Sequence, residues 1–449
     1  MNDYLDAGVV RIQQWLSRTP QLRGRRGAST LVTTATSREH LRPRLEEISG
    51  LAELHEEAGD VDGVVSLRLH RCDQESVRKV ERAVVEHLRR SLPAASLKTT
   101  HRRGPSYVEA RNEPSVFENE WPAAVSEWPP ARPCQWCQVS PATATDYDET
   151  SKQHLALCED CMQRRGHAGY NTSNKHRPGP ERELVRRAER EKAAMTLPDE
   201  FQSLGCVDGQ QQTHVATVQA DGNAIGAFID KVRRKDAGAE RTLPNAIHEA
   251  TWGALLDAVV EITGSEKQLP VIPHLVGGDD VLLSVPAHRG WKFATNFQRR
   301  FTERLAAEVA EPLREAVPTA SIGLVFHHRT VPFFVFTELS EALLGRAKHE
   351  HRGAKPAVAW QEITQDGADP VARPSILRAD LEQYWPALQE LAELPQSTRQ
   401  RLATVLHDDE PVRDKHIARM ELEDTVDRFP ADGPISLNDA LKMVRWWQP

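Results

Sequence analysis

Three aspartates in two separate segments of the chain have the chemistry of a divalent-cation site. Asp221 directly follows the run THVATVQA at 213–220, and Asp279 and Asp280 end the tetrapeptide GGDD. Mg²⁺ and Mn²⁺ prefer oxygen ligands such as carboxylates, waters and phosphate oxygens. Transfer of a phosphoryl or nucleotidyl group from a triphosphate needs such ions, because they neutralise the phosphates. We therefore take these aspartates as candidate catalytic residues and ligands of Mg²⁺ or Mn²⁺.

The GGDD tetrapeptide lies between two short apolar runs. PVIPHLV at 270–276 and VLLSV at 281–285 flank it, which favours a hairpin with the carboxylates at its tip. Gly277 and Gly278 would permit the tight turn and let a phosphate approach the backbone. The tetrapeptide alone favours a polar turn that has no function, because Gly-Asp turns are common. The flanking runs, and the preceding strand that ends in Asp221, favour the functional interpretation.

Four cysteines form two CxxC pairs. Cys134 and Cys137 are separated by 20 residues from Cys158 and Cys161. Four thiolates at this spacing suit tetrahedral Zn²⁺ and leave no coordination position for water. We expect a structural zinc ion in a small knuckle that would not fold on its own core.

Hydrophobic periodicity predicts how the aspartates are positioned. The expected elements are a strand at 213–220, helices at 224–234 and 245–262, strands at 270–276 and 281–285, a helix at 291–309, a strand at 319–326, a helix at 338–350 and a strand at 356–360. This order fits a ferredoxin-like βαββαβ sheet with an added helix and strand. The first strand of such a sheet lies beside the hairpin, so the three carboxylates can meet.

The predicted fold class is α+β, with four parts. They are an α/β domain at 1–113, a linker and zinc-binding insertion at 114–200, the ferredoxin-like domain at 201–365 and an all-helical domain at 366–449. In the first part we expect a helix at 6–18 and a strand at 63–69. The prolines at 114–133 indicate an extended linker.

Composition points to a soluble globular protein of the cytoplasm. The chain has 449 residues and a net charge of -8, and no apolar run approaches the roughly 20 residues that span a bilayer. The first residues lack the pattern of a secretory signal. Any nucleic-acid contact must come from local basic patches. The arginines at 18, 23, 25 and 26 are one such patch, which would contact phosphates of RNA, a nucleotide or a partner, or simply be solvated.

Several motifs together resemble a known family. ADGNAIG at 220–226, GGDD at 277–280, TASIGLVF at 319–326 and LLGRAK at 343–348 resemble the second palm domain of the large polymerase-cyclase subunit of type III CRISPR effector complexes, a Cmr-like subunit. The layout is shared more distantly with GGDEF-type diguanylate cyclases. RIQQWLSRTPQLRGRRGAS at 11–29 and SYVEAR at 106–111 resemble that subunit's first palm domain. The resemblance covers about 10–360.

The resemblance implies an enzyme of antiviral defence. That family converts ATP into cyclic oligoadenylate messengers when its multisubunit complex, with CRISPR RNA and small helical and repeat-type subunits, has bound target RNA. By position, Asp221, Asp279 and Asp280 would bind two Mg²⁺ ions. The nucleotide would be held by Gly277, Gly278, Ser321 and Lys348; from the residues alone, Lys348 is either a triphosphate contact or a solvated lysine.

Three departures keep alternatives open. Asn223 stands where the family often has an aspartate, which removes one carboxylate. The first palm has no GGDD motif. GDVDG at 59–63 lies in a comparable place, so we expect that palm to be degenerate. His407-Asp408 has no matching histidines, and we expect no HD nuclease domain. The alternatives are a catalytically weak or inactive palm scaffold that binds RNA and partner subunits, and a cyclase that makes a cyclic dinucleotide from GTP.

Overall fold

The structure is a computed structural model of the whole chain. It describes residues 1–19, 22–55, 63–123, 132–148, 152–168, 179–191, 195–198, 200–204, 213–235, 242–263, 268–309, 314–430 and 432–447. Within these ranges no helix has the length and apolar character needed to cross a membrane.

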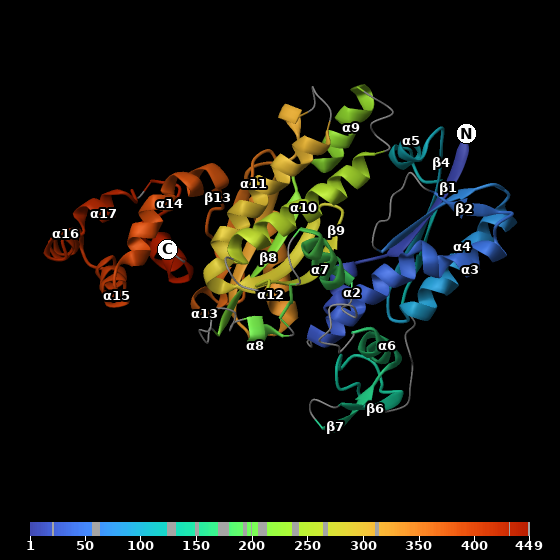
Figure 1. The fold of residues 1–449 in the computed structure, drawn as a ribbon, viewed down its shortest axis with the longest axis horizontal. Helices are drawn as coiled ribbons and strands as arrows, with labels where there is room; N and C mark the ends of the chain where they lie inside the picture. The colour runs from blue at the N-terminus through green and yellow to red at the C-terminus, as the bar shows by residue number, and fades with distance from the viewer. Residues whose placement is uncertain are drawn as a thin grey trace.

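The first domain is an antiparallel sheet with α2, α3 and α4 against one face and the short helix α5 against the other (Figure 1). Its strand order is β2-β3-β1-β4-β5, with β1 Asn2–Val9, β2 Ala52–Leu54, β3 Val64–Leu69, β4 Leu97–Gly104 and β5 Phe117–Trp121. The helices are α1 Ile12–Leu16, α2 Leu22–Thr36, α3 Arg38–Glu47, α4 Gln74–Ser91 and α5 Tyr107–Asn112. The arrangement of β1 to β4 is that of a ferredoxin-like sheet.

Two expectations for this region are wrong. The helix expected at 6–18 is a strand followed by the short helix α1, because β1 pairs on both sides with β3 and β4. The linker expected from 114 begins with β5, which pairs with β4 and extends the first sheet. Residues 59–62 of the GDVDG segment lie outside the described residues.

The second domain has the predicted order of elements. Its sheet runs β13-β12-β11-β8-β10-β9, with β8 His214–Gly222, β9 Ile272–Gly277, β10 Asp280–Pro286, β11 Ala320–His328, β12 Ala357–Glu362 and β13 Ile376–Leu377. Its helices are α9 Ile225–Lys235, α10 Leu243–Thr263, α11 Gly290–Glu308 and α12 Phe333–Glu350. The predicted elements are confirmed, although α12 begins five residues earlier than expected.

Two layers of helix hold the second sheet in place. Phe293, Phe297 and Phe301 repeat every four residues along α11 and are fully buried against the face that α10 also covers. The other face carries α12. It shares one hydrophobic core with the first domain, in which Leu282 and Phe336 join residues of β1, α2 and α4. The two sheet domains are therefore packed together and not merely linked.

A small insertion and a helical domain complete the chain. The insertion contains the hairpin β6 Ala144–Asp148 and β7 Gln153–Leu157, followed by α6 Glu159–His167, and lies against α2. The segments α7 Gly179–Glu191 and α8 Phe201–Leu204 come next. After α13 Ile363–Asp366, the helices at the far end in Figure 1 are α14 Arg378–Glu393, α15 Gln396–Val405, α16 Glu410–Arg419, α17 Glu423–Asp427 and α18 Leu437–Met443.

Candidate nucleotide and metal site

The fold brings the three aspartates to the same end of the second sheet. β8 and β10 pair antiparallel with Val281 opposite Ala220, so one further step places Asp280 opposite Asp221. The backbone N–H of Gly222 donates to Oδ2 of Asp279 at 3.2 Å. Segments about 58 residues apart in sequence thus meet at hydrogen-bond distance, as the pattern of strands predicts.

Glycines make this close approach possible. Gly278 has φ +60° in the two-residue turn between the paired Gly277 and Asp280, and Asp279 keeps a negative φ, which is the pattern of a type II′ turn. A Cβ on Gly222 would lie 2.7 Å from Oδ2 of Asp279. Gly222 is therefore the residue that lets the strand end and the turn touch.

A lysine of α12 also reaches the site. The ammonium group of Lys348 forms an ion pair with Asp221 and donates to the carbonyl oxygen of Gly222 at 2.9 Å. Its side chain remains partly exposed. The sequence interpretation of Lys348 as a simply solvated lysine is wrong, because it contacts one of the candidate metal ligands.

The carboxylates lie in an environment that is short of positive charge. Loss of hydration raises the pKa of Asp279 to about 7, and contact with Asp221 together with the charge of Asp280 adds to the rise. Loss of hydration and the charge of Asp221 raise the pKa of Asp280 to about 6, and Lys348 opposes that rise. The side chain of Asp280 is more exposed than that of Asp279 and keeps more of its hydration, which fits the smaller rise of its pKa. Mutual repulsion of this kind is what a bound divalent cation relieves, so the three residues fit a metal site.

Two other residues named from the sequence serve the protein interior. Asn223 is buried, and its amide nitrogen donates to Oγ1 of Thr319 at 2.9 Å and to the carbonyl oxygen of Lys355 at 3.2 Å. Ser321 is fully buried and donates to Oδ1 of Asn223 at 2.9 Å. In this arrangement Ser321 contacts Asn223 and does not reach solvent. The amide at 223 suits its three partners, because an aspartate there would face the Lys355 carbonyl with a second acceptor.

The sequence predicted a helix at 224–234, but the role that the start of this helix, α9, could have in anion binding was missed. The helix begins at Ile225, directly after the strand end that carries Asp221, with the exposed Ala224 at φ +53°. The first N–H groups of a helix have no partner within the helix and favour anions. The run Asp221-Gly-Asn-Ala-Ile-Gly, in which a strand passes into a helix within four residues, is the signal that would have indicated it.

The four cysteines meet as expected. Cys134, Cys137, Cys158 and Cys161 are buried, and one ligand atom from each lies within 4.8 Å of the others. In the described part of the chain no other set of three or more metal-binding side chains is as tightly grouped, and the three aspartates are more widely spread. The chemistry of four thiols at this spacing fits Zn²⁺.

The arginines before this cluster contact protein groups. Arg23 pairs with Asp148 at 3.0 Å and Arg26 with Glu181 at 2.5 Å, while Arg25 is 4% exposed. Asp160 and the sulfurs of two cysteines raise the pKa of Arg18, although burial opposes the rise. The interpretation of this segment as a phosphate-binding patch is therefore not supported for these side chains.

Comparison with known protein families finds a match for the second domain. Residues 214–358 match the family described as Cas10/Cmr2, second palm domain. A search of curated protein sequences found no match.

The whole chain resembles solved structures of Csm1. They include the Csm1–Csm4 cassette in complex with cA4 and Csm1 of T. onnurineus, each with 13% identity and a TM-score of 0.57. The Csm1–Csm4 cassette in complex with AMPPNP has 12% identity and a TM-score of 0.57. Each match covers 99% of this chain and 69% of the other. At this identity the likeness shows the fold. Residues 214–358 thus match the second palm domain of Cas10/Cmr2, and the overall fold of the chain is that of the Csm1 structures.

Proposed function

We propose that this chain is a metal-dependent nucleotidyl cyclase that converts ATP into cyclic oligoadenylate. The observation that carries the proposal is the meeting of Asp221, Asp279 and Asp280 at one sheet end, beside a glycine turn and the start of α9. Solved Csm1–Csm4 structures of the same fold contain cA4, pppApA or AMPPNP, which are a cyclic product, a linear dinucleotide and an ATP analogue. These ligands support ATP as the substrate class.

In this proposal the three carboxylates hold two Mg²⁺ or Mn²⁺ ions. Bound ions would neutralise the triphosphate and activate the attacking hydroxyl. Asp279 is already oriented by the N–H of Gly222. Gly277 and Gly278 leave the turn open for phosphates, since a Cβ on Gly278 would meet no atom within 4 Å.

Lys348 would exchange partners when the nucleotide binds. Its ammonium neutralises Asp221 and lies within reach of the site. Once a cation takes over the charge of Asp221, the lysine becomes free to contact a phosphate oxygen. Lysine suits this role because its ammonium is a mobile point charge on a flexible stem.

The test is product formation by the purified chain, alone and assembled with its effector subunits and target RNA. Incubated with ATP and Mg²⁺ or Mn²⁺, the active assembly is expected to yield cyclic adenylates that mass spectrometry identifies. An Asp279→Ala/Asp280→Ala variant should yield none, whereas a Glu410→Ala/Asp414→Ala variant, which removes two exposed carboxylates of α16, should be active. If neither the wild type nor the Asp279→Ala/Asp280→Ala variant makes a cyclic product in an RNA-activated assembly, the proposal is refuted. A parallel incubation with GTP that yields a cyclic guanylate, while ATP yields no product, would identify the GTP alternative.

A second candidate is a scaffold whose palm does no chemistry. Asn223 favours it, because this residue binds protein groups and supplies no carboxylate. A scaffold would not need the aspartates to bind ATP, so binding of a metal–ATP analogue separates the two. For either function we propose a structural Zn²⁺ at the four cysteines and a place in a multisubunit complex with RNA. Csm4 accompanies Csm1 in several of the similar structures.

A further inference from the structure

The last turn of α12 is held from two sides. Lys348 points to the sheet end and pairs with Asp221. Arg346 and Glu350, two residues before and after it, are about 200° away around the helix. They bind the segment 367–375, which leads from α13 into the C-terminal helices and which we call the strap. Whatever positions the strap therefore also positions the turn that carries Lys348.

The contacts between α12 and the strap are specific. Nη1 of Arg346 donates to the carbonyl oxygens of Val371 and Arg373, at 2.5 Å and 3.1 Å. Oε2 of Glu350 accepts from the backbone N–H and the hydroxyl of Ser375, at 2.8 Å and 2.5 Å. Arg346 and Glu350, in the last turn of α12, thus bind the strap at 371–373 and at 375.

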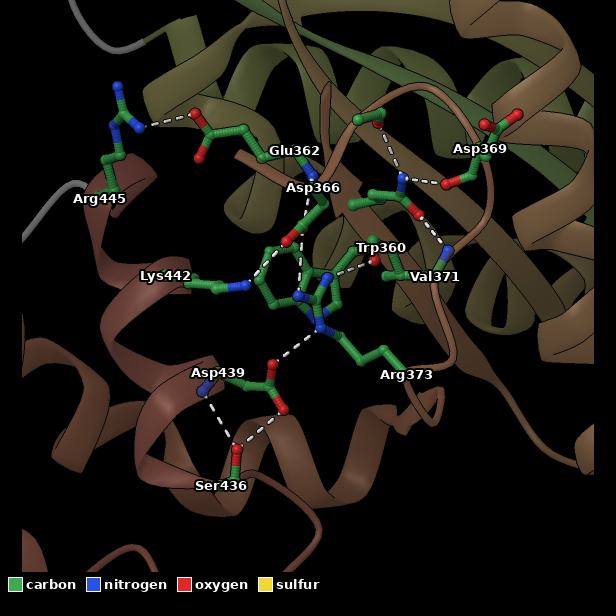
Figure 2. A network of polar contacts seen from close by, with 12 residues as sticks. Trp360, Glu362, Asp366, Asp369, Val371, Arg373, Ser436, Asp439, Lys442 and Arg445 are labelled. Carbon is green, nitrogen blue, oxygen red and sulfur yellow. Dashed lines mark hydrogen bonds and ion pairs between the residues drawn. The ribbon is translucent and has the colours of Figure 1, made fainter. Parts of the chain in front are cut away.

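Arg373 connects the strap to the C-terminal helical domain (Figure 2). Its Nε donates to Oδ1 of Asp439 on α18 at 2.8 Å, and its Nη2 donates to Oδ2 of Asp366 at 3.1 Å. The guanidinium lies over the ring of Trp360, 4.0 Å from its centroid, and donates to that residue's carbonyl oxygen. Lys442 of α18 binds the other oxygen of Asp366 at 2.7 Å. Arg373 is nearly buried, so these bonds are made in surroundings with little water to screen them.

We propose that Arg373 and the strap are positioning elements for Lys348, through which the C-terminal helical domain sets how firmly Lys348 holds Asp221. The effect on nucleotide binding rests on the proposed function. The link from Arg373 to Lys348 does not. The path has three steps: Asp439 to Arg373, the strap carbonyls to Arg346, and two residues along α12 from Arg346 to Lys348. A partner that shifts α18 would act on the nucleotide site without touching it.

The mechanical link is tested by the reactivity of Lys348 in the absence of nucleotide. A lysine whose nitrogen is held by a carboxylate and a backbone carbonyl acylates slowly, because the nitrogen must leave these partners to reach the ester. An Arg373→Met variant keeps an apolar stem over Trp360 and loses the bonds to Asp439 and Asp366. Acetylation by an N-hydroxysuccinimide ester, read by peptide mass spectrometry, should be about 3- to 10-fold faster at Lys348 in this variant, the usual size of coupling between connected residues.

Two comparisons separate positioning from general loosening. Lys98, which pairs with Glu118 at 2.7 Å in the first domain, should acetylate at an unchanged rate. Arg428→Met, which breaks an exposed pair with Glu390 at 2.7 Å within the helical domain, should leave Lys348 at its wild-type rate. Should Arg373→Met prove unstable, Asp439→Asn removes only the charge on α18 and should act in the same direction. An unchanged rate at Lys348, or an equal rise at Lys98, would overturn the proposal.

The catalytic meaning is tested by a double-mutant cycle on binding of Mn²⁺ and AMPPNP. Arg373→Met should weaken binding about 3- to 10-fold in the wild type, because a less firmly positioned Lys348 loses more in its contact with the phosphate than the metal gains at Asp221. It should have no effect in a Lys348→Met background, because the effect passes through that lysine. Equal losses in both backgrounds would show that Arg373 acts by another route. If the wild-type chain binds no nucleotide, the proposed function fails, while the acetylation result still decides whether the strap controls Lys348.

Discussion

At the scale of single residues, the candidate site depends on contacts that tolerate little added volume or charge. The backbone of Gly222 touches the Asp279 carboxylate, and Lys348 neutralises Asp221. Asn223 and Ser321 tie the strand end to β11 from inside. The site is therefore two layers deep, with carboxylates toward solvent and an amide–hydroxyl pair beneath them.

Gly222→Ala should disrupt the site with little effect elsewhere. The new Cβ would lie 2.6 Å from Cγ1 of Ile225 and 2.7 Å from Oδ2 of Asp279, so the turn must move. We expect Mn²⁺ and nucleotide binding to fall at least tenfold, with about 1–3 kcal/mol lost from the free energy of unfolding. Calorimetry and urea unfolding measure the two effects. Gly50→Ala in the first domain is the matched control, because its Cβ would meet no atom within 4 Å; wild-type binding in both variants would contradict the account.

The raised pKa of Asp279, about 7, predicts a pH dependence of stability. The ordinary pKa in the unfolded chain is lower, so the stability linked to this group is present in acid and is lost as pH rises toward 7. Asp279→Asn should therefore stabilise the chain when no Mg²⁺ or Mn²⁺ is added, by roughly 1–2 kcal/mol at pH 8 and by less at pH 5. Urea unfolding at the two pH values measures this difference, and an identical difference at both would count against the coupling.

The sequence indicated which residues form the site but not how each is used. Asp221 and the GGDD turn could be predicted, because strand and turn signals are local. The roles of Asn223 and Ser321 could not, since they depend on Thr319 and Lys355 across the sheet. The arginines at 23, 25 and 26 were misleading because charge in a sequence does not reveal whether acidic partners lie nearby in space.

At the scale of elements, alternation and four-residue spacing predicted the second domain well and the first domain less well. Strands β8, β10 and β11 have strong apolar runs. β1 carries Asp3 and Asp6 in its sequence NDYLDAGV, and only its pairing with β3 and β4 makes it a strand. Tertiary pairing overrides local propensity in such a segment.

The contact between α2 and α6 provides a test at this scale. A Cβ on Gly27 would lie 1.7 Å from the carbonyl oxygen of Arg164, so the two helices touch through a glycine. Gly27→Ala should separate the cysteine-bearing insertion from the first domain and cost about 3 kcal/mol or more of unfolding free energy. Gly166→Ala on α6, whose Cβ would meet nothing within 4 Å, should be neutral or slightly stabilising in thermal unfolding. Equal melting temperatures for the two variants would exclude this close contact.

At the scale of the whole molecule, two interfaces join the two sheet domains and the helical domain. An apolar core shared by β1, α2, α4 and α12 joins the two sheet domains. A second apolar core, which includes Trp291 and Trp447, and the ion pairs of Asp366 and Arg373 join the helical domain to the second sheet. Neither interface could be predicted from the sequence, because Arg373 and Asp439 are 66 residues apart and carry no motif.

Metal removal should show that the cysteine cluster stabilises the insertion and does no chemistry. We expect one Zn²⁺ per chain, released by a strong chelator or by Cys137→Ser. Its loss should unfold the region around β6 and β7, because four buried thiols cannot replace a core. Hydrogen exchange should then rise at 153–157 but not at 214–222, whereas a rise in both segments would indicate that zinc supports the palm directly.

The most direct test of the central claim is binding of Mn²⁺ together with AMPPNP to the intact chain. Calorimetry and the electron paramagnetic resonance of Mn²⁺ measure this binding. We expect nucleotide binding that requires metal, with Mn²⁺ bound in the complex. Asp221→Asn and Asp279→Ala/Asp280→Ala should each abolish it, and Glu410→Ala/Asp414→Ala should not. Metal-dependent binding that survives loss of all three palm carboxylates would contradict the assignment of the site.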